Sequence, residues 1–225
     1  MLELLAVEKR FGATRVLDSI SLSVERGRCL CIIGPNAAGK TTLLSIAAGL
    51  LAPDGGTVHR GGRVGFVPQD AAVLGDLSVN DNLRLWYAAH EKKVRLFAPD
   101  SPEQLLGLEP YRKTRAKALS GGLRRRLAIA AALTGDPDDL LLDEPFVSLD
   151  AAACEELCAL LGALKRRGLG LLLTSHDPAR IAAVADEAVL LENGRLTARI
   201  TPPAPGQPLR LEQVLSLLAG GTPFS

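Results

Sequence analysis

The chain has 225 residues, of which 47% are hydrophobic and 23% are charged, and its formal net charge is +1. This composition is typical of one large globular domain or two small ones, and the nearly neutral charge argues against nucleic acid as a partner. No apolar run reaches the roughly 18 residues that a membrane span needs, and the N-terminus lacks the features of a signal peptide. We therefore expect a cytoplasmic protein.

The first part of the chain predicts short strands that lead into a buried one. Leu2, Leu4 and Ala6 alternate along one face, and a turn at 11–13 separates them from a second alternating stretch that ends at Val24. The apolar run 29–33 then predicts a fully buried strand. Residues 42–49 follow as a helix that glycine closes.

A loop with the spacing of a phosphate-binding motif joins that buried strand to the helix. Its glycines allow a close backbone approach to phosphate, and free N–H groups at the helix start attract an anion. Lys40 adds a positive charge for the β- and γ-phosphates, and Thr41 offers a hydroxyl to Mg²⁺. We therefore predict a site for a nucleoside triphosphate with Mg²⁺. The nucleotide-binding candidates here are Gly34, Pro35, Asn36, Ala37, Ala38, Gly39, Lys40, Thr41 and Thr42.

The middle of the chain changes from strand to helix patterns. Strands are predicted at 57–58 and 64–67, and from Ser78 to about Leu133 the apolar spacing is helical. Ser78 is the expected N-cap of the first helix there, whose apolar positions are Val79, Leu83, Trp86 and His90. Prolines interrupt the pattern, and further helices are expected from 101 and over 123–133. This block is predicted to be inserted into an α/β core.

Strands and helices alternate again after the helical block, which predicts a largely parallel sheet. Strands are expected at 140–142, 169–174, 188–191 and 195–200, and helices at 151–167, 178–185 and 209–218. A proline-rich spacer precedes the last helix. The cysteine pairs Cys29/Cys31 and Cys154/Cys158 lack the Cys-x-x-Cys spacing of a zinc site, so we expect buried free thiols.

Two further motifs point to triphosphate chemistry. Asp143 and Glu144 end an apolar strand, where a parallel sheet faces its ligand, so Asp143 is a candidate for Mg²⁺ and Glu144 for the attacking water. Ser120, Gly121 and Gly122 open a helix and so predict a second anion site. One phosphate loop suffices for an ordinary P-loop enzyme, so this second site needs a reason.

With these motifs in the same order, the chain resembles the nucleotide-binding subunit of an ATP-binding-cassette (ABC) transporter. The matching stretches are 34–41, 119–122, 140–145, 148–150 and 175–177. The resemblance implies an α/β P-loop core with a mostly parallel sheet, an N-terminal antiparallel β subdomain and an inserted helical subdomain at about 76–134. It assigns 1–200 to the ATPase domain and leaves 201–225 as spacer and C-terminal helix.

The resemblance also implies roles for further residues. Phe11 matches the aromatic residue that stacks on adenine, and Gln69 matches a glutamine that contacts Mg²⁺ or the water. His176 matches the histidine that bonds the γ-phosphate. Ser120 to Gly122 match the signature that closes over the ATP of the other subunit, and Asp150 matches the loop that links the two sites. The implied catalytic residues are Glu144, His176, Gln69 and Lys40, and the implied metal ligands are Thr41, Gln69 and Asp143.

Two positions depart from the family pattern. Ala37 stands where glycine is usual, and it would strain the loop by about 1 kcal/mol or more only if its φ is positive. Leu123 stands where a glutamine often follows the signature, so a polar group is lost there. Neither change touches Lys40, Thr41 or the two acids, and we expect an active ATPase.

The resemblance predicts a subunit that dimerises head to tail around two ATP molecules and drives a separate membrane-spanning partner. The short helical block, with its start at 78–83, resembles that of two-component exporters. The alternatives are an ABC-type ATPase outside transport, a P-loop kinase of a small metabolite and a regulatory subunit that binds ATP without hydrolysis. The signature argues against the kinase, and Glu144 with His176 argues against the last.

Overall fold

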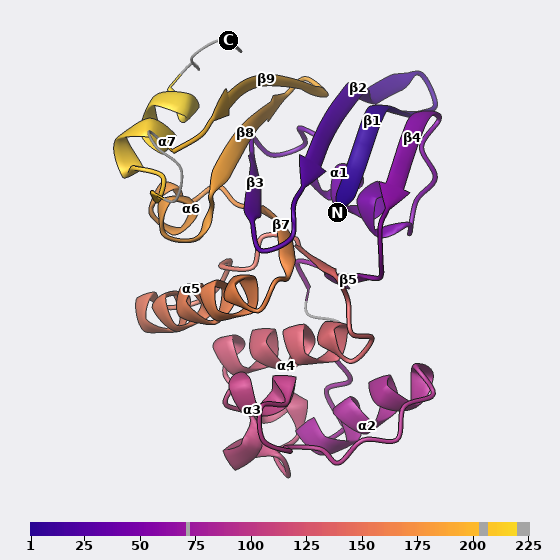
Figure 1. Cartoon of the computed structure of the whole chain (residues 1–225), viewed down its shortest axis with the longest axis vertical. Helices are drawn as coiled ribbons and strands as arrows, with labels where there is room; N and C mark the ends of the chain where they lie inside the picture. Colours follow the sequence, from indigo (N-terminus) through magenta and orange to yellow (C-terminus); the bar gives the residue numbers. More distant parts are fainter. Residues whose placement is uncertain (71–72, 203–206, 220–225) are drawn as a thin grey trace.

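The computed structural model describes residues 1–70, 73–202 and 207–219. A small antiparallel sheet forms the N-terminal part, with strand order β2-β1-β4 (Figure 1). The strands are β1 (Leu2–Phe11), β2 (Thr14–Val24) and β4 (Gly55–Arg60). The predicted short strands before Val24 are thus two long ones. Because β1 bulges at Ala6, where φ is 48°, Ala6 is exposed and Val7 continues the buried face, contrary to the predicted alternation.

The larger sheet has the order β5-β6-β7-β3-β8-β9, and all neighbouring pairs except β8 with β9 are parallel. Buried runs rich in Leu, Ile and Val make the central strands β6, β7, β3 and β8, as expected where both faces of a parallel sheet are covered. The bounds of the strands in this sheet are β3 (Cys29–Ile33), β5 (Val64–Val67), β6 (Asp139–Leu142), β7 (Gly170–Thr174), β8 (Glu187–Glu192) and β9 (Arg195–Ile200).

Helices cover this sheet from both sides. Caps set their starts: the Asp150 carboxylate accepts from Ala153 N at 2.8 Å, and Asp177 accepts from Ala179 N at 3.0 Å. The final helix packs on the core, because its Val214 and Leu217 are buried there. The four helices are α1 (Lys40–Ala48), α5 (Ala151–Arg166), α6 (Pro178–Val184) and α7 (Leu211–Leu218). Residues 203–206 of the predicted spacer lie outside the described residues.

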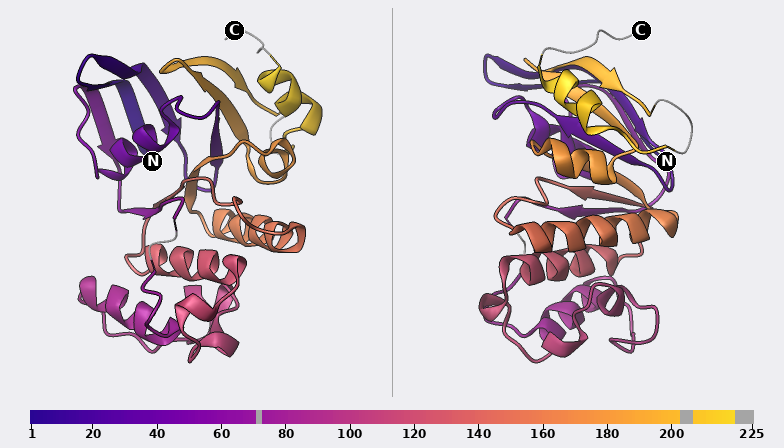
Figure 2. Two further views of the ribbon diagram at one scale, coloured as in Figure 1. Left: turned by 180° about the vertical axis from the view of Figure 1, so that it is seen from behind. Right: turned by 90° about the vertical axis from the view of Figure 1, so that its left-hand side faces the viewer.

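The helical block lies at one end of the long axis, away from the small sheet (Figures 1 and 2). Ser78 caps its first helix as predicted, by accepting from Asp81 N at 3.1 Å. Val79, Leu83 and Tyr87 form the buried face, while Trp86 is half-buried and His90 is exposed. The block contains α2 (Val79–Ala89), α3 (Pro102–Leu105), the 3₁₀ turns η1 (Glu109–Tyr111) and η2 (Ala116–Ala118), and α4 (Gly121–Leu133).

Two apolar cores meet at the larger sheet, and alternate residues of its strands enter each. In β3, Leu30 and Ile32 join the core shared with α1 and the small sheet, whereas Cys29 and Cys31 join the core under α4, α5 and α6. All four cysteines are free thiols, and burial raises the pKa of each. No helix within the described residues is long and apolar enough to cross a membrane.

Candidate functional site

The phosphate loop, residues 34–39, leaves the carboxyl end of β3 and enters α1 directly. Gly39 adopts φ 102° and precedes the first helical residue, Lys40. A Cβ on Gly39 would lie 2.9 Å from Leu17 Cδ2, so both its conformation and its close packing require glycine. The loop therefore presents backbone N–H groups at the start of α1, as the sequence predicts.

Ala37 adopts φ 64°, in the left-handed region. The position where glycine is usual thus has a conformation that favours glycine, and the methyl group costs about 1 kcal/mol or more. The second departure, Leu123, is half-buried and packs against the larger core. Its side chain serves packing where a glutamine would offer a polar group.

Lys40 is buried, and its amine is held by the loop that it follows. Lys40 Nζ donates to Gly34 O at 2.8 Å and to Pro35 O at 3.1 Å. The same nitrogen lies 3.8 Å from Glu144 Oε1. The positive charge is therefore fixed over the loop, between the helix start and the acid, where a phosphate could meet it.

Asp143 is fixed at the end of β6 by two hydroxyl groups. Its Oδ2 accepts from Thr41 Oγ1 and its Oδ1 accepts from Thr174 Oγ1, both at 2.7 Å. Gln69 lines the same cavity as Asp143 and Thr41. Together these three side chains offer a set of hard oxygen donors. This set fits Mg²⁺, which prefers oxygen ligands and binds together with substrate phosphates.

Glu144 stands beside Asp143 with φ 44°, and its backbone N donates to Thr174 Oγ1 at 2.8 Å. Its Oε2 lies 3.0 Å from His176 Nδ1, at the end of the neighbouring strand β7. Because the carboxylate is nearly buried and partnered by an imidazole, it can accept a proton from a bound water. Thr174 thus orients both acids. The sequence reasoning missed it, although it is the one polar residue that ends a strand of leucines.

One cavity of about 430 Å³ at the carboxyl edge of the sheet brings together Lys40, Thr41, Asp143, Glu144 and His176. Most of the predicted phosphate and metal residues meet there. Phe11 does not line it: the ring is 52% exposed at the end of β1, with Lys9 Nζ 5.6 Å from its centroid. The lining residues include Asn36, Ala37, Gly39, Lys40, Thr41, Thr42, Gln69, Asp143, Glu144 and His176, together with Val16 and Val147, which the sequence did not indicate.

The signature residues lie apart from this cavity. Ser120 caps α4 by accepting from Leu123 N at 3.3 Å, and Gly121 lines a second cavity of about 330 Å³. Asp150 caps α5. Gly122 packs against α5, because a Cβ there would lie 3.0 Å from that of Ala153. Within the described part of the chain, the second cavity shares only Gln69 and Val147 with the first.

Arg125 ties the helical block to the segment between the two cavities. This buried guanidinium of α4 donates to Pro68 O at 2.8 Å and to Gln69 O at 2.7 Å. Desolvation lowers the pKa of Arg125, and the charges of Asp143 and Asp70 oppose this shift. Sequence reasoning missed this residue too, although a cation before the apolar run 127–133 was a visible signal.

The path from β3 through the loop into α1, with Thr41 bonded to the acid that ends β6, is the arrangement of proteins that bind and hydrolyse nucleoside triphosphates. In class, then, this is a P-loop nucleotide hydrolase. Residues 17–147 match the family described as ABC transporter, which covers more than half of the chain. The chain belongs to this family and is an ABC-type ATP-binding subunit with ATPase activity.

Several proteins of this family are similar along most of the chain. An uncharacterized ABC transporter ATP-binding protein of Rhizobium meliloti is 36% identical, over 84% of this chain and 76% of that protein. The Nod factor export ATP-binding protein I of Ralstonia nicotianae is also 36% identical, over 87% and 65% of the two lengths. A sulfate/thiosulfate import ATP-binding protein of Chromobacterium violaceum is 36% identical, over 88% and 57%.

Solved structures confirm the predicted fold class. The ATP-binding subunit of an ABC transporter superposes with a TM-score of 0.76 at 27% identity, over 89% of this chain and 90% of that one. A dimeric bacterial ABC transporter cassette superposes with a TM-score of 0.78 at 23% identity, over 89% and 98%. Among the sequence relatives described above, one is named as an export protein and one as an import protein.

Proposed function

We propose that the chain binds Mg²⁺ and ATP in the first cavity and hydrolyses the nucleotide within a head-to-tail dimer that drives a membrane-spanning partner. Lys40 would donate hydrogen bonds to phosphate oxygens, and Phe11 would stack on adenine. These two contacts would orient the nucleotide. Thr41, Gln69 and Asp143 would hold the metal, which when bound neutralises charge on the phosphates. Glu144 would take the proton of the attacking water, and His176 would bond the γ-phosphate.

One observation supports the dimer more than any other: the two anion-binding elements of one chain open into different cavities. Ser120 and Gly121 stand at the start of α4, outside the cavity that holds Lys40 and Glu144. In the proposed dimer the signature of one chain, from Ser120 to Gly122, completes the site of the other. Asp150 would then lie where the two sites communicate.

A groove at the junction of the helical block and the larger sheet is the proposed seat of the membrane partner. Trp86 of α2 and His90, the C-cap of that helix, line it together with β5 and the end of α4, around about 220 Å³. Half-buried Trp86 offers an apolar surface to a cytoplasmic helix of the partner. The subunit would thereby be held at the cytoplasmic face of the membrane. The proposed direction is export, which rests on the resemblance of the short helical block to that of two-component exporters.

A mixing experiment tests the shared site. One variant carries Lys40→Ala and the other Ser120→Arg, so each homodimer lacks one part of every site and should be inactive. Random mixing makes about half of the dimers mixed, and each mixed dimer has one intact site. At equal mixing, roughly a quarter of all sites should be intact, so the ATPase rate should recover to roughly a quarter of the wild-type rate.

The measurement is ATPase rate against mixing ratio at concentrations that allow subunit exchange. Ser120→Ala serves as a milder control, since it removes the helix cap without filling the interface with a charged side chain. A flat, inactive profile from chains that demonstrably form mixed dimers in ATP would contradict the shared site. Activity of the Ser120→Arg homodimer close to wild type would do the same.

A further inference from the structure

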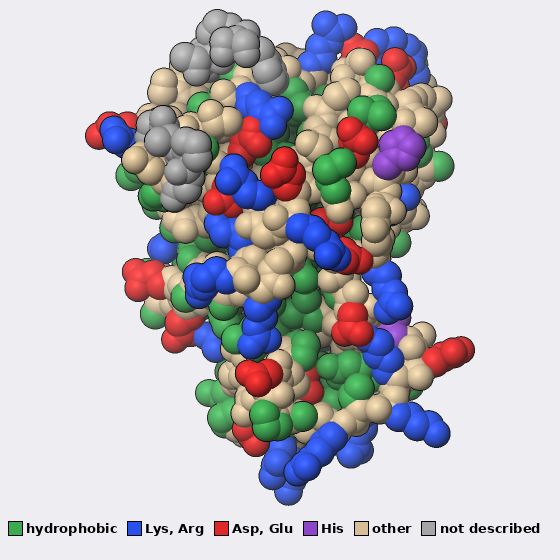
Figure 3. Space-filling model, in the orientation of Figure 1, with side chains coloured by type: hydrophobic (Ala, Val, Ile, Leu, Met, Phe, Trp, Pro, Cys, Tyr) green, Lys and Arg blue, Asp and Glu red, His purple; other side chains and the backbone are tan. Residues whose placement is uncertain are grey.

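The helical block contains a basic pocket that the ATPase site does not use. Residues 76–134 contain eleven lysine and arginine residues against six aspartate and glutamate residues, although the whole chain has a net charge of only +1. In Figure 3 the blue side chains gather at the end of the molecule that the helical block occupies. A pocket of about 660 Å³ opens there, and six of its twelve described lining residues are Lys or Arg while none is acidic.

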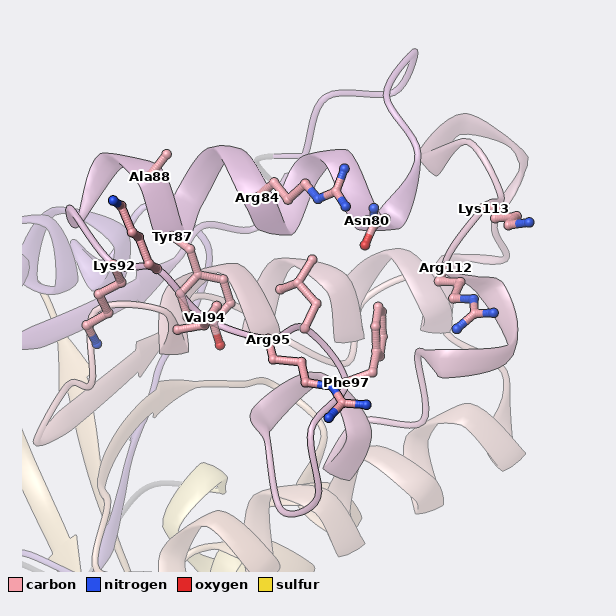
Figure 4. A pocket seen from close by; sticks show the side chains of 12 residues that line it. Asn80, Arg84, Tyr87, Ala88, Lys92, Val94, Arg95, Phe97, Arg112 and Lys113 are labelled. Atoms are coloured by element: carbon pink, nitrogen blue, oxygen red, sulfur yellow. The ribbon is translucent and has the colours of Figure 1, made fainter.

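Three segments of the helical block contribute these cations to the lining of one pocket. Arg84 projects from α2, Arg95 from the loop that follows it, and Arg112 from the segment after η1, as Figure 4 shows. Lys93 and Lys113 line the same pocket. Among the described residues, none of these five side chains forms an ion pair, and all five are exposed.

The nearby acids are engaged elsewhere. Glu103 is 1% exposed, and its two carboxylate oxygens accept from Phe97 N at 2.8 Å and from Tyr87 OH at 3.2 Å. The carboxylate of Asp81 accepts from Ser78 Oγ at 2.6 Å, at the helix cap. Asp136 pairs with Lys92, the sixth cation of the pocket. The other five positive charges have no ion-pair partner in the described part of the chain, and they repel one another.

Hydrogen bonds hold the walls of the pocket in place. Glu103 fixes the loop at Phe97, whose φ is 60°, and bonds it to Tyr87 of α2. The opposite wall is tied to the start of α2, because Asn80 N donates to Arg112 O at 2.9 Å. The cations are thus presented by a preformed concave site with aromatic side chains at its base, rather than by a flat charged surface.

We propose that this pocket binds a phosphate-bearing ligand with at least two negative charges. Three guanidinium groups offer planar pairs of N–H donors that match phosphate oxygens, and the two lysines add point charges. Tyr87 and Phe97 exclude part of the water, which strengthens each contact and gives room to an apolar portion of the ligand. The same phosphate chemistry is supplied by a free anion or by the head group of an anionic lipid.

The test compares two doubly substituted chains of equal net charge. The pocket variant carries Lys93→Gln and Arg95→Gln, and the control variant carries Arg115→Gln and Arg166→Gln, which are exposed cations outside the pocket. Calorimetric titration with inorganic pyrophosphate measures the free anion. Both variants keep the phosphate loop, so any difference between them belongs to the pocket. Pyrophosphate binding should weaken about tenfold or more in the pocket variant and stay unchanged in the control.

A second arm measures cosedimentation with vesicles of phosphatidylcholine and phosphatidylglycerol in equal amounts. If the pocket variant loses vesicle binding but keeps pyrophosphate binding, the ligand is the head group of a lipid. If it loses pyrophosphate binding but keeps vesicle binding, the ligand is a free phosphate. Equal binding by the two variants in both arms would overturn the proposal. So would pocket-dependent binding of a polyglutamate peptide in the absence of either phosphate response, because the pocket would then recognise an acidic protein segment. Basal ATPase activity, expected to be unchanged, verifies that both variants fold.

Discussion

At the scale of single residues, the contacts of Glu144 predict a role in ATP hydrolysis rather than in ATP binding. Its carboxylate faces His176 and lies within 3.8 Å of Lys40, while Asp143 bonds Thr41. Glu144→Gln should therefore keep ATP binding and lower hydrolysis at least about 100-fold, since the amide cannot accept a proton. Phosphate release and nucleotide titration measure the two effects. Glu155→Gln, an exposed change on α5, is the control. Turnover near wild type would remove Glu144 from the role of base.

The conformation of Ala37 leads to a prediction about stability. Ala37→Gly removes a side chain from a residue with φ 64°, so the variant should gain about 1 kcal/mol in free energy of unfolding. Ala38→Gly is the matched control, because Ala38 is buried in the core beside α1 and its loss should destabilise. Urea titration of both variants gives the two signs. A loss of stability in Ala37→Gly would mean that the methyl group contributes packing that outweighs its strain.

Some residues of the candidate site belong to short sequence motifs, whereas others are positioned by partners far away in the chain. Lys40 and Asp143 could be predicted because each belongs to a short motif whose local geometry carries its chemistry. Thr174 and Arg125 could not, because their partners are 31 and 56 to 57 positions away in the chain. Their positions in the sequence are visible, but their neighbours in the chain do not reveal a partner that only the strand order or a helix crossing brings near.

At the scale of elements, periodicity located most helices and strands and failed where a local irregularity shifts it. The bulge at Ala6 is one such case, since one extra residue moves the next side chain to the other face. In α2 the predicted apolar positions included His90, whereas the buried face ends at Tyr87 and His90 caps the helix. The spacing of apolar residues therefore predicts where a helix lies but does not determine the residue at which it ends.

The same helix yields a test of the proposed groove. Trp86 is the only tryptophan of the chain, so its fluorescence reports one site. Because Trp86 is half-buried and lines the groove, acrylamide should quench it to a degree between that of a buried residue and that of the urea-unfolded chain. Complete protection of Trp86 in the isolated subunit would contradict an accessible docking groove and assign the ring to the core.

At the scale of the whole molecule, the stability of the fold should depend on pH through Asp139. This residue begins β6 at 0% exposure, and among the described residues no donor hydrogen-bonds its carboxylate oxygens. Burial raises its pKa, opposed in part by the N-terminal amine and Arg26. The folded state therefore binds the proton more tightly than the unfolded state, so this contribution to stability is present at low pH and is lost as the pH rises through the folded pKa.

Asp139→Asn should accordingly raise the free energy of unfolding by about 1 kcal/mol at neutral pH. The advantage over wild type should shrink as the pH falls, because the wild-type carboxyl becomes neutral as well. Urea titrations at several pH values measure both effects. Asp76→Asn, at a side chain that is 86% exposed, is the control and should leave the pH dependence unchanged. A constant difference across the pH range would show that packing, rather than charge, separates the variants.

The architecture of the whole molecule could be predicted because alternating strands and helices restrict the sheet topology to few solutions. The order β5-β6-β7-β3-β8-β9 follows from pairings between distant segments, which no single stretch of sequence contains. The division between residues 1–200 and 201–225 stays a prediction. The burial of Val214 and Leu217 shows that the last helix packs with the core rather than standing apart.

Arg125 gives the molecule a mechanical property. Its two hydrogen bonds, 2.8 and 2.7 Å long, join α4 to the backbone at Pro68 and Gln69, and Gln69 lines both cavities. A rotation of the helical block must move that backbone unless both bonds break. A rotation of the block would therefore be transmitted to Gln69, which lines the same cavity as the acids that follow β6.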